Sequence, residues 1–88
     1  MKDLGSTIHN EKYRQLVRRL VELRRIAELS QQALAEALGL DQPDISKIEN
    51  FERRLDALEL MLWLKVVSPN RYALVEDALS REGKEDGR

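Results

Sequence analysis

The stretch that decides the fold is residues 29–50, which read LSQQALAEALGLDQPDISKIEN. Ser30 is a residue type that accepts hydrogen bonds from the backbone N–H groups at the start of a helix. Gly39 can adopt the positive φ angle with which helices commonly end. The first half of the stretch therefore predicts a helix over 31–38.

A second helix is predicted directly after the first. Asp41 is again an N-cap residue, and Pro43 falls in a first turn, where its missing N–H costs no hydrogen bond. The helix runs over 42–50, and about three residues connect it to the first, as in a helix-turn-helix. The small side chain of Ala35 allows the two helices to cross closely. The wedge between them is expected to consist of Leu34, Leu38, Ile45 and Ile48.

Three further helices are expected around this pair, so the predicted fold is all-α with five helices. Over 11–28, apolar residues recur at intervals of three and four, as on one face of a helix. Over 56–66, Asp56 and Glu59 resemble a capping box that opens a helix. A Ser-Pro pair opens the last helix, which is expected over 68–83.

The composition indicates one small domain. The chain has 88 residues, of which 42% are hydrophobic and 35% charged, and its formal net charge is −1. A chain of this length builds a single core. We expect residues 1–10 to form a flexible arm, residues 11–81 the folded domain, and residues 82–88 a disordered charged tail.

The sequence also excludes several classes of protein. It contains no cysteine, so disulfides and thiolate sites are excluded and a reducing cytoplasm is expected. It has no apolar run that could span a bilayer and no signal-peptide pattern at its start. His9 is the only histidine and has no neighbouring His or Cys. We therefore expect neither a metal site nor a cofactor nor enzymatic activity.

The residues around the central pair resemble the XRE-type helix-turn-helix family, which comprises the Cro and lambda-repressor-like DNA-binding domains. The likeness covers residues 23–62. It implies a five-helix lambda-repressor-like domain that binds double-stranded DNA through its central helix-turn-helix. The stretches that carry it are Leu23-Arg24, Leu29-Ser30-Gln31, Leu34-Ala35, Leu38-Gly39 and Ile45-Ser46-Lys47-Ile48-Glu49.

Phe51 is a departure from the resemblance, because the family usually has glycine after this helix. Phenylalanine resists the positive φ angle that glycine adopts. We therefore expect the chain to leave the helix over 42–50 along a different path, through residues 52–54.

The outward side of the helix over 42–50 is the expected DNA-reading surface. At 100° per residue, Ile45 and Ile48 point to the core, which leaves the opposite side to enter a major groove. Gln, Lys and Ser side chains can all hydrogen bond to base edges there. The resemblance also places Asp41 and Asp44 near bases, although an N-cap role for the first and a helix-dipole role for the second are the stronger interpretation. The expected base-reading residues are Gln42, Pro43, Ser46, Lys47, Asp41 and Asp44.

Phosphate contacts are expected beside this surface. By resemblance, Gln31 hydrogen bonds a phosphate at the start of its helix, where the helix dipole also favours an anion. Arg53 and Arg54 follow the helix over 42–50, where family members commonly touch the DNA backbone, and Asn50 is a weaker candidate. Arginines that only make the surface soluble are an equally good explanation of the pair.

One ion pair is expected inside the domain. Glu49 falls partly on the inward side of its helix, and a buried carboxylate needs a partner. The resemblance supplies Arg24 as that partner and implies a structural role for the pair, not a catalytic one.

The helix over 56–66 is apolar on more than one side. The stripe that we expect in the core consists of Leu55, Leu58, Leu62 and Val66. A second stripe, with the helix over 68–83, is expected to form a two-fold interface between two copies, although cover within one chain explains it too. Trp63 belongs either to the core or to this interface. The expected interface residues are Leu60, Trp63, Leu64, Val67, Tyr72, Val75 and Leu79.

These features predict a cytoplasmic, sequence-specific DNA-binding transcriptional regulator that acts as a homodimer on a palindromic operator. With no ligand domain, it would repress by occupying that operator. An alternative is the antitoxin of a toxin–antitoxin pair, whose main contact is a partner protein, since the near-neutral charge is compatible with both. A third interpretation is a helix-turn-helix that makes structural contacts only.

Overall fold

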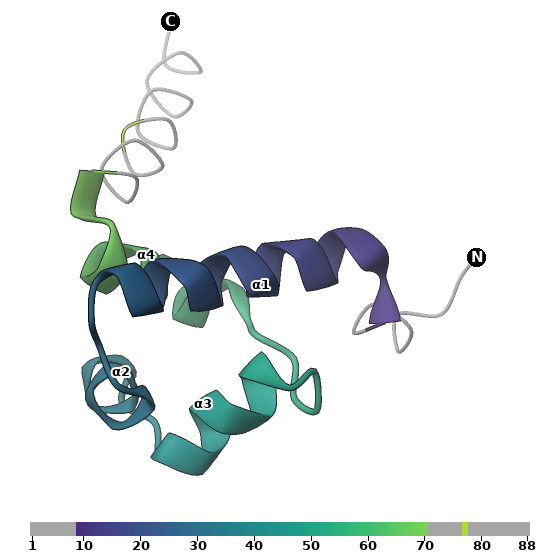
Figure 1. The fold of residues 1–88 in the computed structure, drawn as a ribbon, viewed down its shortest axis with the longest axis horizontal. Coiled ribbons are helices and arrows are strands. Elements are labelled where there is room, and N and C mark those ends of the chain that lie inside the picture. Colours follow the sequence, from purple (N-terminus) through teal and green to yellow (C-terminus); the bar gives the residue numbers. More distant parts are fainter. Residues whose placement is uncertain (1–8, 71–76, 78–88) are drawn as a thin grey trace, which may run out of the picture.

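The computed structural model describes residues 9–70 and residue 77, whose arrangement is drawn in Figure 1. The regular elements in this part are α1 (Glu11–Ile26), α2 (Gln31–Leu38), α3 (Gln42–Glu49) and α4 (Ala57–Val67). α2 packs against α3 and α4, and α1 packs against the same two helices. In the figure α1 crosses the molecule, with α2 and α3 on one side of it. The predicted all-α class is confirmed for the described residues.

The predicted helix bounds hold to within two residues. α2 has the predicted bounds, α3 ends one residue early and α1 two residues early, and α4 begins directly after Asp56. Of the fifth helix, predicted over 68–83, the structure describes Pro69, Asn70 and residue 77 as helical, and the rest lies outside the described residues. Most of the predicted arm over 1–10 and all of the predicted tail over 82–88 also lie outside them.

Side-chain caps fix where the helices begin. Ser30 Oγ accepts from the Ala33 N–H over 3.0 Å at the start of α2. At the start of α4, Asp56 Oδ1 accepts from the Glu59 N–H over 2.8 Å, and Glu59 Oε1 accepts from the Asp56 N–H over 3.1 Å. This is the predicted capping box, in which two backbone donors without partners in the helix are satisfied reciprocally. The cap of α1 is Asn10, whose side chain accepts from the N–H groups of Lys12 and Tyr13.

The first three helices end in the same way. At the end of α2, Leu40 N–H donates to Ala35 O over 2.8 Å and Gly39 N–H donates to Glu36 O over 3.3 Å. These paired bonds form a Schellman motif, which requires a positive φ at Gly39, observed at 74°. The corresponding bonds close α1 and α3, where the positive φ falls on Glu28 (60°) and on Phe51 (62°).

The expectation that Phe51 redirects the chain is therefore wrong. Its backbone adopts the left-handed conformation that a glycine would take, with Phe51 N–H bonded to Ile48 O and Glu52 N–H bonded to Lys47 O. The hydrogen bonds that close α3 require this conformation, and the ring that it places outside the helix lies over Arg14, whose guanidinium carbon is 4.6 Å from the ring centroid.

The core lies where α2, α3 and α4 meet α1. The four predicted wedge residues are all buried, as are Val17, Leu20, Leu23, Ala35, Leu55 and Trp63. Trp63 is completely buried, and its Nε1 donates to Leu20 O over 3.1 Å, so its one polar group is satisfied inside the core. Of the two places expected for Trp63, the core is the one observed, so this side chain has no surface to offer to a second copy.

α4 turns a different face inward from the one expected. Of the stripe predicted for the core, only Leu55 is buried, while Leu58 is 68% exposed and the other two are half-buried. Within the helix, the buried residues are Glu59 and Trp63. A helix that is apolar on nearly every side carries no periodicity from which its inner face can be chosen, and a carboxylate can lie inward when it has an ion-pair partner.

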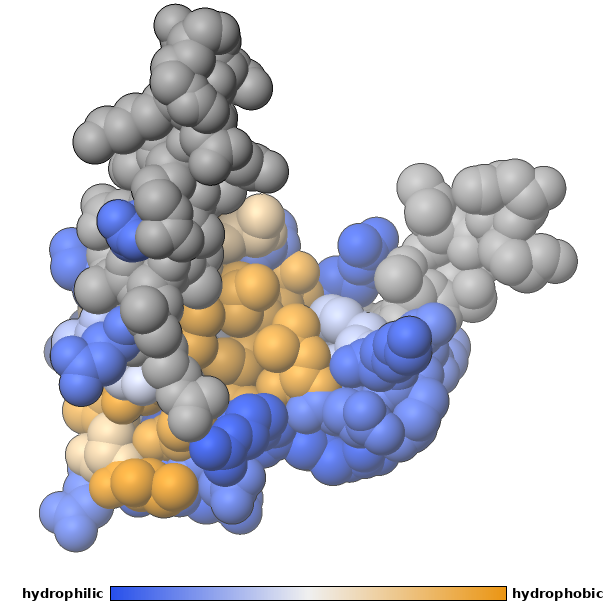
Figure 2. Space-filling model, turned by 90° about the horizontal axis from the view of Figure 1, so that it is seen from above, coloured by the Kyte–Doolittle hydropathy of each residue, from blue (hydrophilic) through white to orange (hydrophobic). Residues whose placement is uncertain are grey.

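Apolar side chains also remain at the surface around α4. Figure 2, a view from above Figure 1 onto the side of α1 and α4, shows hydrophobic residues gathered in the centre of this face. The half-buried residues of α4 that pack on the core are Leu60, Leu62, Leu64, Val66 and Val67.

In the part of the chain that the structure describes, none of the helices has the length and apolar character needed to cross a bilayer.

Candidate nucleic-acid interface

α3 has one buried and one exposed side. Ile45 and Ile48 are fully buried, whereas Pro43 and Lys47 are exposed and Ser46 is half-buried. The exposed side of an α-helix fits the major groove of B-DNA, whose base edges carry distinct donor and acceptor patterns. Within this face, Asn50 Nδ2 donates to Ser46 Oγ over 3.4 Å, which links the last turn to the middle of the helix.

Gln31 and Gln42 meet at the N-terminal ends of α2 and α3. Gln42 Nε2 donates to Gln31 Oε1 over 2.7 Å, and Gln31 Nε2 donates to Glu49 Oε1 over 2.9 Å. One of these residues is expected to bind phosphate and the other to read a base. Their contact leaves the Oε1 of Gln42 and its second amide hydrogen available. This acceptor and donor match the N6 donor and the N7 acceptor that adenine presents in the major groove.

Arg24 and Glu49 anchor this hydrogen-bonded chain to the core. Arg24 Nε lies 2.7 Å from Glu49 Oε2, Arg24 Nη2 lies 3.1 Å from Glu49 Oε1, and Arg24 Nη1 donates to Leu29 O over 2.7 Å. The side chains of the two ion-pair partners are only 10% and 7% exposed. Arg24, Glu49, Gln31 and Gln42 therefore form one continuous polar network, which runs from the interior to the exposed start of α3.

Asp41 and Asp44 lie at the start of α3. The Asp44 carboxylate accepts from the Asp41 N–H over 3.2 Å, and it stands in the first turn, where a negative charge stabilises the helix dipole. Asp44 is half-buried and Asp41 is exposed. This contact favours the structural interpretation of Asp44 over a base contact.

Arg53 is paired with a residue of α4. Its Nη1 lies 3.0 Å from Glu59 Oε1 and its Nη2 lies 2.9 Å from Glu59 Oε2, so the pairing is bidentate. The hydrogen bonds from Arg53 hold the pKa of the buried Glu59 carboxyl below its ordinary value, and the Glu59 carboxylate raises the pKa of Arg53 in return. The pair fixes the loop between α3 and α4.

Arg54 and Lys47 remain as candidates for contacts with DNA. Both side chains are exposed, and neither forms an ion pair or hydrogen bond with any residue that the structure describes. Arg54 stands in the loop directly after α3, and Lys47 on its exposed side. The two arginines predicted to bind phosphate thus differ: Arg53 is paired with Glu59, whereas Arg54 has no side-chain partner among the described residues.

Two residues of the site were not anticipated from the sequence. Glu59 was expected only as part of a capping box, yet its carboxylate also binds Arg53. Phe51 was expected to disturb the end of α3, yet its ring joins that end to α1 through Arg14 and Arg18. No local pattern could have revealed the contacts of Phe51, because its partners lie more than thirty residues away in sequence. Among residues 9–70 and 77, no cluster of His, Cys, Asp and Glu could hold a metal ion.

Comparison with known proteins assigns the chain to a family. No curated protein sequence matches it. A family model described as helix-turn-helix matches residues 20–67, which is more than half of the chain and includes all of α2, α3 and α4. The matched region contains the exposed face of α3 and the whole polar network behind it. The chain therefore belongs to the XRE-type helix-turn-helix family of DNA-binding transcription regulators.

Proposed function

We propose that this protein is a cytoplasmic transcriptional repressor that binds a palindromic operator as a homodimer. The observation that carries the proposal is the hydrogen bond from Gln42 to Gln31, because it holds an amide that can hydrogen bond to adenine at the N-terminal end of α3. In this proposal, the protein represses transcription by occupying its operator.

Base recognition would divide between the two ends of α3. Gln42, at the N-terminal end, can bind adenine through its amide. Lys47, one turn and a half further on, can donate to the acceptors of guanine, and Pro43 and Ser46 line the same face. Each such contact is worth about 1 to 3 kcal/mol of discrimination against the wrong base.

The dimer part of the proposal is supported by the apolar surface of α4. Leu60, Leu64 and Val67 are half-buried in one chain, so a second copy can cover them further. The other expected interface residues, Tyr72, Val75 and Leu79, lie outside the described residues. A small domain gains stability by covering such surface, and a two-fold dimer would match two half-sites about 34 Å apart on the DNA.

The test is a selection of the full chain against random duplex DNA, with sequencing of the bound pool and light scattering of the complex. We expect an enriched palindrome bound by two protein chains. A double variant, Gln42→Ala with Lys47→Ala, should lose about 1 to 3 kcal/mol of binding per base contact and accept more sequences. Unchanged affinity of the double variant would refute α3 as the reading surface, and a pool without enrichment would refute the operator.

The second candidate function is an antitoxin that binds a partner protein. Two large apolar side chains favour this function, since Ile26 and Leu58 are each 68% exposed and are not part of the buried core. Exposed apolar residues of this kind mark surfaces that bind other proteins when they belong to a larger patch. A small protein that copurifies in fixed stoichiometry and is released by Ile26→Ser or Leu58→Ser would establish this function, whereas an isolated dimer that binds its operator would remove the reason for it.

A further inference from the structure

Phe51 occupies a backbone conformation that its own side chain opposes. Its φ angle is 62°, in the left-handed region, where a β-carbon crowds the backbone. The conformation is needed because Phe51 N–H donates to Ile48 O over 3.1 Å and Glu52 N–H donates to Lys47 O over 2.8 Å, which closes α3. A glycine would serve this closure without strain, which directs attention to what the aromatic ring contacts.

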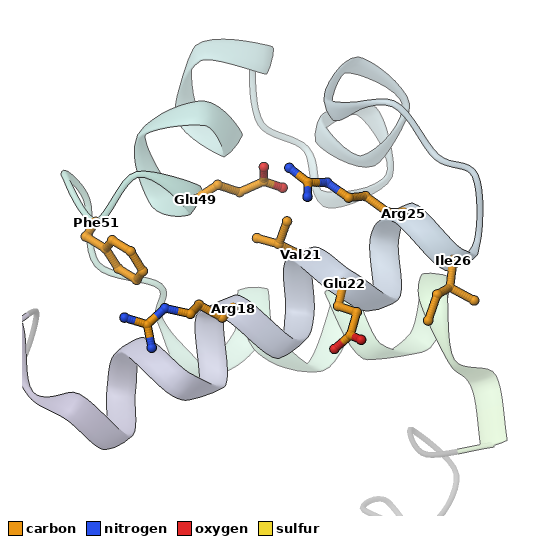
Figure 3. Close-up of a pocket in the computed structure, with 7 residues that line it drawn as sticks. All are labelled: Arg18, Val21, Glu22, Arg25, Ile26, Glu49 and Phe51. Atoms are coloured by element: carbon orange, nitrogen blue, oxygen red, sulfur yellow. The ribbon is translucent and has the colours of Figure 1, made fainter.

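The ring of Phe51 connects the end of α3 to α1. The guanidinium carbon of Arg14 lies 4.6 Å from its centroid and that of Arg18 lies 5.7 Å away, both within the range of a cation–π interaction. Figure 3 shows the Phe51 ring beside the end of the Arg18 side chain, which extends from α1. Two cations one helical turn apart thus face one aromatic ring from a different element.

The space beside this contact is open. A cavity of about 470 Å³ lies between α1 and the end of α3, with Val21, Arg25, Glu49 and the Phe51 ring among its walls (Figure 3). Ile45 and Ile48 fix the buried side of α3 in the core. At its C-terminal end, α3 is held to α1 by Glu49, through Arg24, and by Phe51, through Arg14 and Arg18.

We propose that Phe51 is a positioning residue, whose ring sets the direction in which α3 and the following loop are presented to DNA. This inference rests on the proposed DNA binding. Lys47 and Arg54 lie on either side of Phe51 in sequence, and Lys47 O accepts from Glu52 and from Arg53. A rotation of the helix end therefore moves both free cations together, away from the base and phosphate positions that they must reach.

The test compares three variants of the full chain at one position. Phe51→Gly removes the ring and the backbone strain together, Phe51→Leu removes the aromatic ring but keeps the strain, and Phe51→Tyr keeps the ring. We expect Phe51→Gly to unfold at the same or a higher temperature than the parent and to bind the selected operator about tenfold more weakly. Phe51→Tyr should bind as the parent does, and Phe51→Leu should lose both affinity and thermal stability.

The slope of binding against salt tests whether the ring acts through Arg54. Because loss of the ring moves Arg54 away from its phosphate, the slope of Phe51→Gly should be smaller than that of the parent by about 1, as expected for Arg54→Ala. Operator affinity of Phe51→Gly equal to that of the parent, at equal stability, would overturn the proposal. So would a loss of affinity in Phe51→Tyr as large as that in Phe51→Gly.

A measurement without DNA distinguishes failure of this inference from failure of the proposed function. Residual dipolar couplings of the α3 amides report the direction of α3 relative to α1. We expect them to change in Phe51→Gly and Phe51→Leu and to be retained in Phe51→Tyr, with the couplings of α1 and α2 unaltered in all three. If no operator is found, the proposed function fails, and unchanged α3 couplings in Phe51→Gly would then also reject the role of the ring.

Discussion

Gln42 donates to Gln31 through a hydrogen bond of 2.7 Å, so the first residues of α2 and α3 are joined side chain to side chain. The bond restricts the rotamers of Gln42 before any base is present, which lowers the entropic cost of binding. Because Gln31 is itself held by Glu49 over 2.9 Å, the restriction originates in the interior of the domain.

The first prediction concerns the coupling between these two glutamines. Gln31→Ala should weaken operator binding and relax the preference for the base that Gln42 reads, even at a base that Gln31 does not touch. A double-mutant cycle with Gln42→Ala should give a coupling of about 0.5 to 3 kcal/mol, as for residues in one hydrogen-bond network. Operator affinities of the two single variants and the double variant supply the cycle. Strict additivity would show that the two side chains act independently.

The second prediction separates two neighbouring arginines. Arg54→Ala should weaken binding to all sequences alike and reduce the salt slope of binding by about 1, because a phosphate contact is lost. Arg53→Ala should instead lower stability, because the buried carboxylate of Glu59 loses its partner. Salt titrations of DNA binding and urea unfolding of both variants provide the comparison. Equal effects of the two substitutions on the salt slope would contradict the assignment of Arg53 as a structural residue.

The third prediction concerns the buried ion pair. Glu49→Ala leaves Arg24 charged and largely buried, which should cost about 3 to 5 kcal/mol in the free energy of unfolding. A matched control is Glu22→Ala, which breaks the exposed pair between Arg19 and Glu22 and should cost less than about 1 kcal/mol. Urea unfolding at neutral pH measures both. A cost of Glu49→Ala no greater than that of the control would argue against a structural role for the network.

The fourth prediction is a dependence of stability on pH. The pKa of Glu59 is lower in the folded state than its ordinary value of 4.5, mainly because Arg53 hydrogen bonds to its carboxylate. A lowered folded-state pKa means that the stabilisation is complete above the unfolded-state pKa and is lost as the pH falls through the folded-state pKa. The free energy of unfolding should therefore decrease below about pH 4.5, and Glu59→Gln should make this decrease shallower. Denaturant unfolding of both proteins between pH 7 and pH 3 is the measurement, and parallel curves would contradict the prediction.

The fifth prediction uses the strained end of α1. Glu28 has a φ of 60°, and its exposed side chain forms no hydrogen bond or ion pair with any residue that the structure describes, so no such interaction offsets the strain of its β-carbon. Glu28→Gly should raise the free energy of unfolding by about 1 kcal/mol. Glu36→Gly, a control inside α2, should lower it by a similar amount, because glycine weakens a helix interior by about 1 kcal/mol. Thermal unfolding of the two variants is the measurement. Changes of the same sign in their free energies of unfolding would contradict the strain argument.

How much could be predicted from the sequence depended on how local the responsible interactions are. The N-caps at Ser30 and Asp56 and the turn at Gly39 depend on a few adjacent residues, so the helix bounds were predicted closely. The inner face of α4 could not be predicted, because its apolar residues occur on every side and the inward place of Glu59 depends on Arg53. The conformation of Phe51 was predicted wrongly because the local preference of phenylalanine takes no account of the hydrogen bonds that close α3, and because the partners of the ring, Arg14 and Arg18, are distant in sequence.

The buried and exposed residues of α3 are subject to different constraints during evolution. Ile45, Ile48 and Glu49 fasten the helix to the rest of the domain, whereas Pro43 and Lys47 contribute nothing to the interior. Mutations at these two outward positions can therefore accumulate without loss of folding. A duplicated gene could acquire a new operator through one or two such changes while every copy remains folded, so that families of regulators diverge in their targets faster than in their structures.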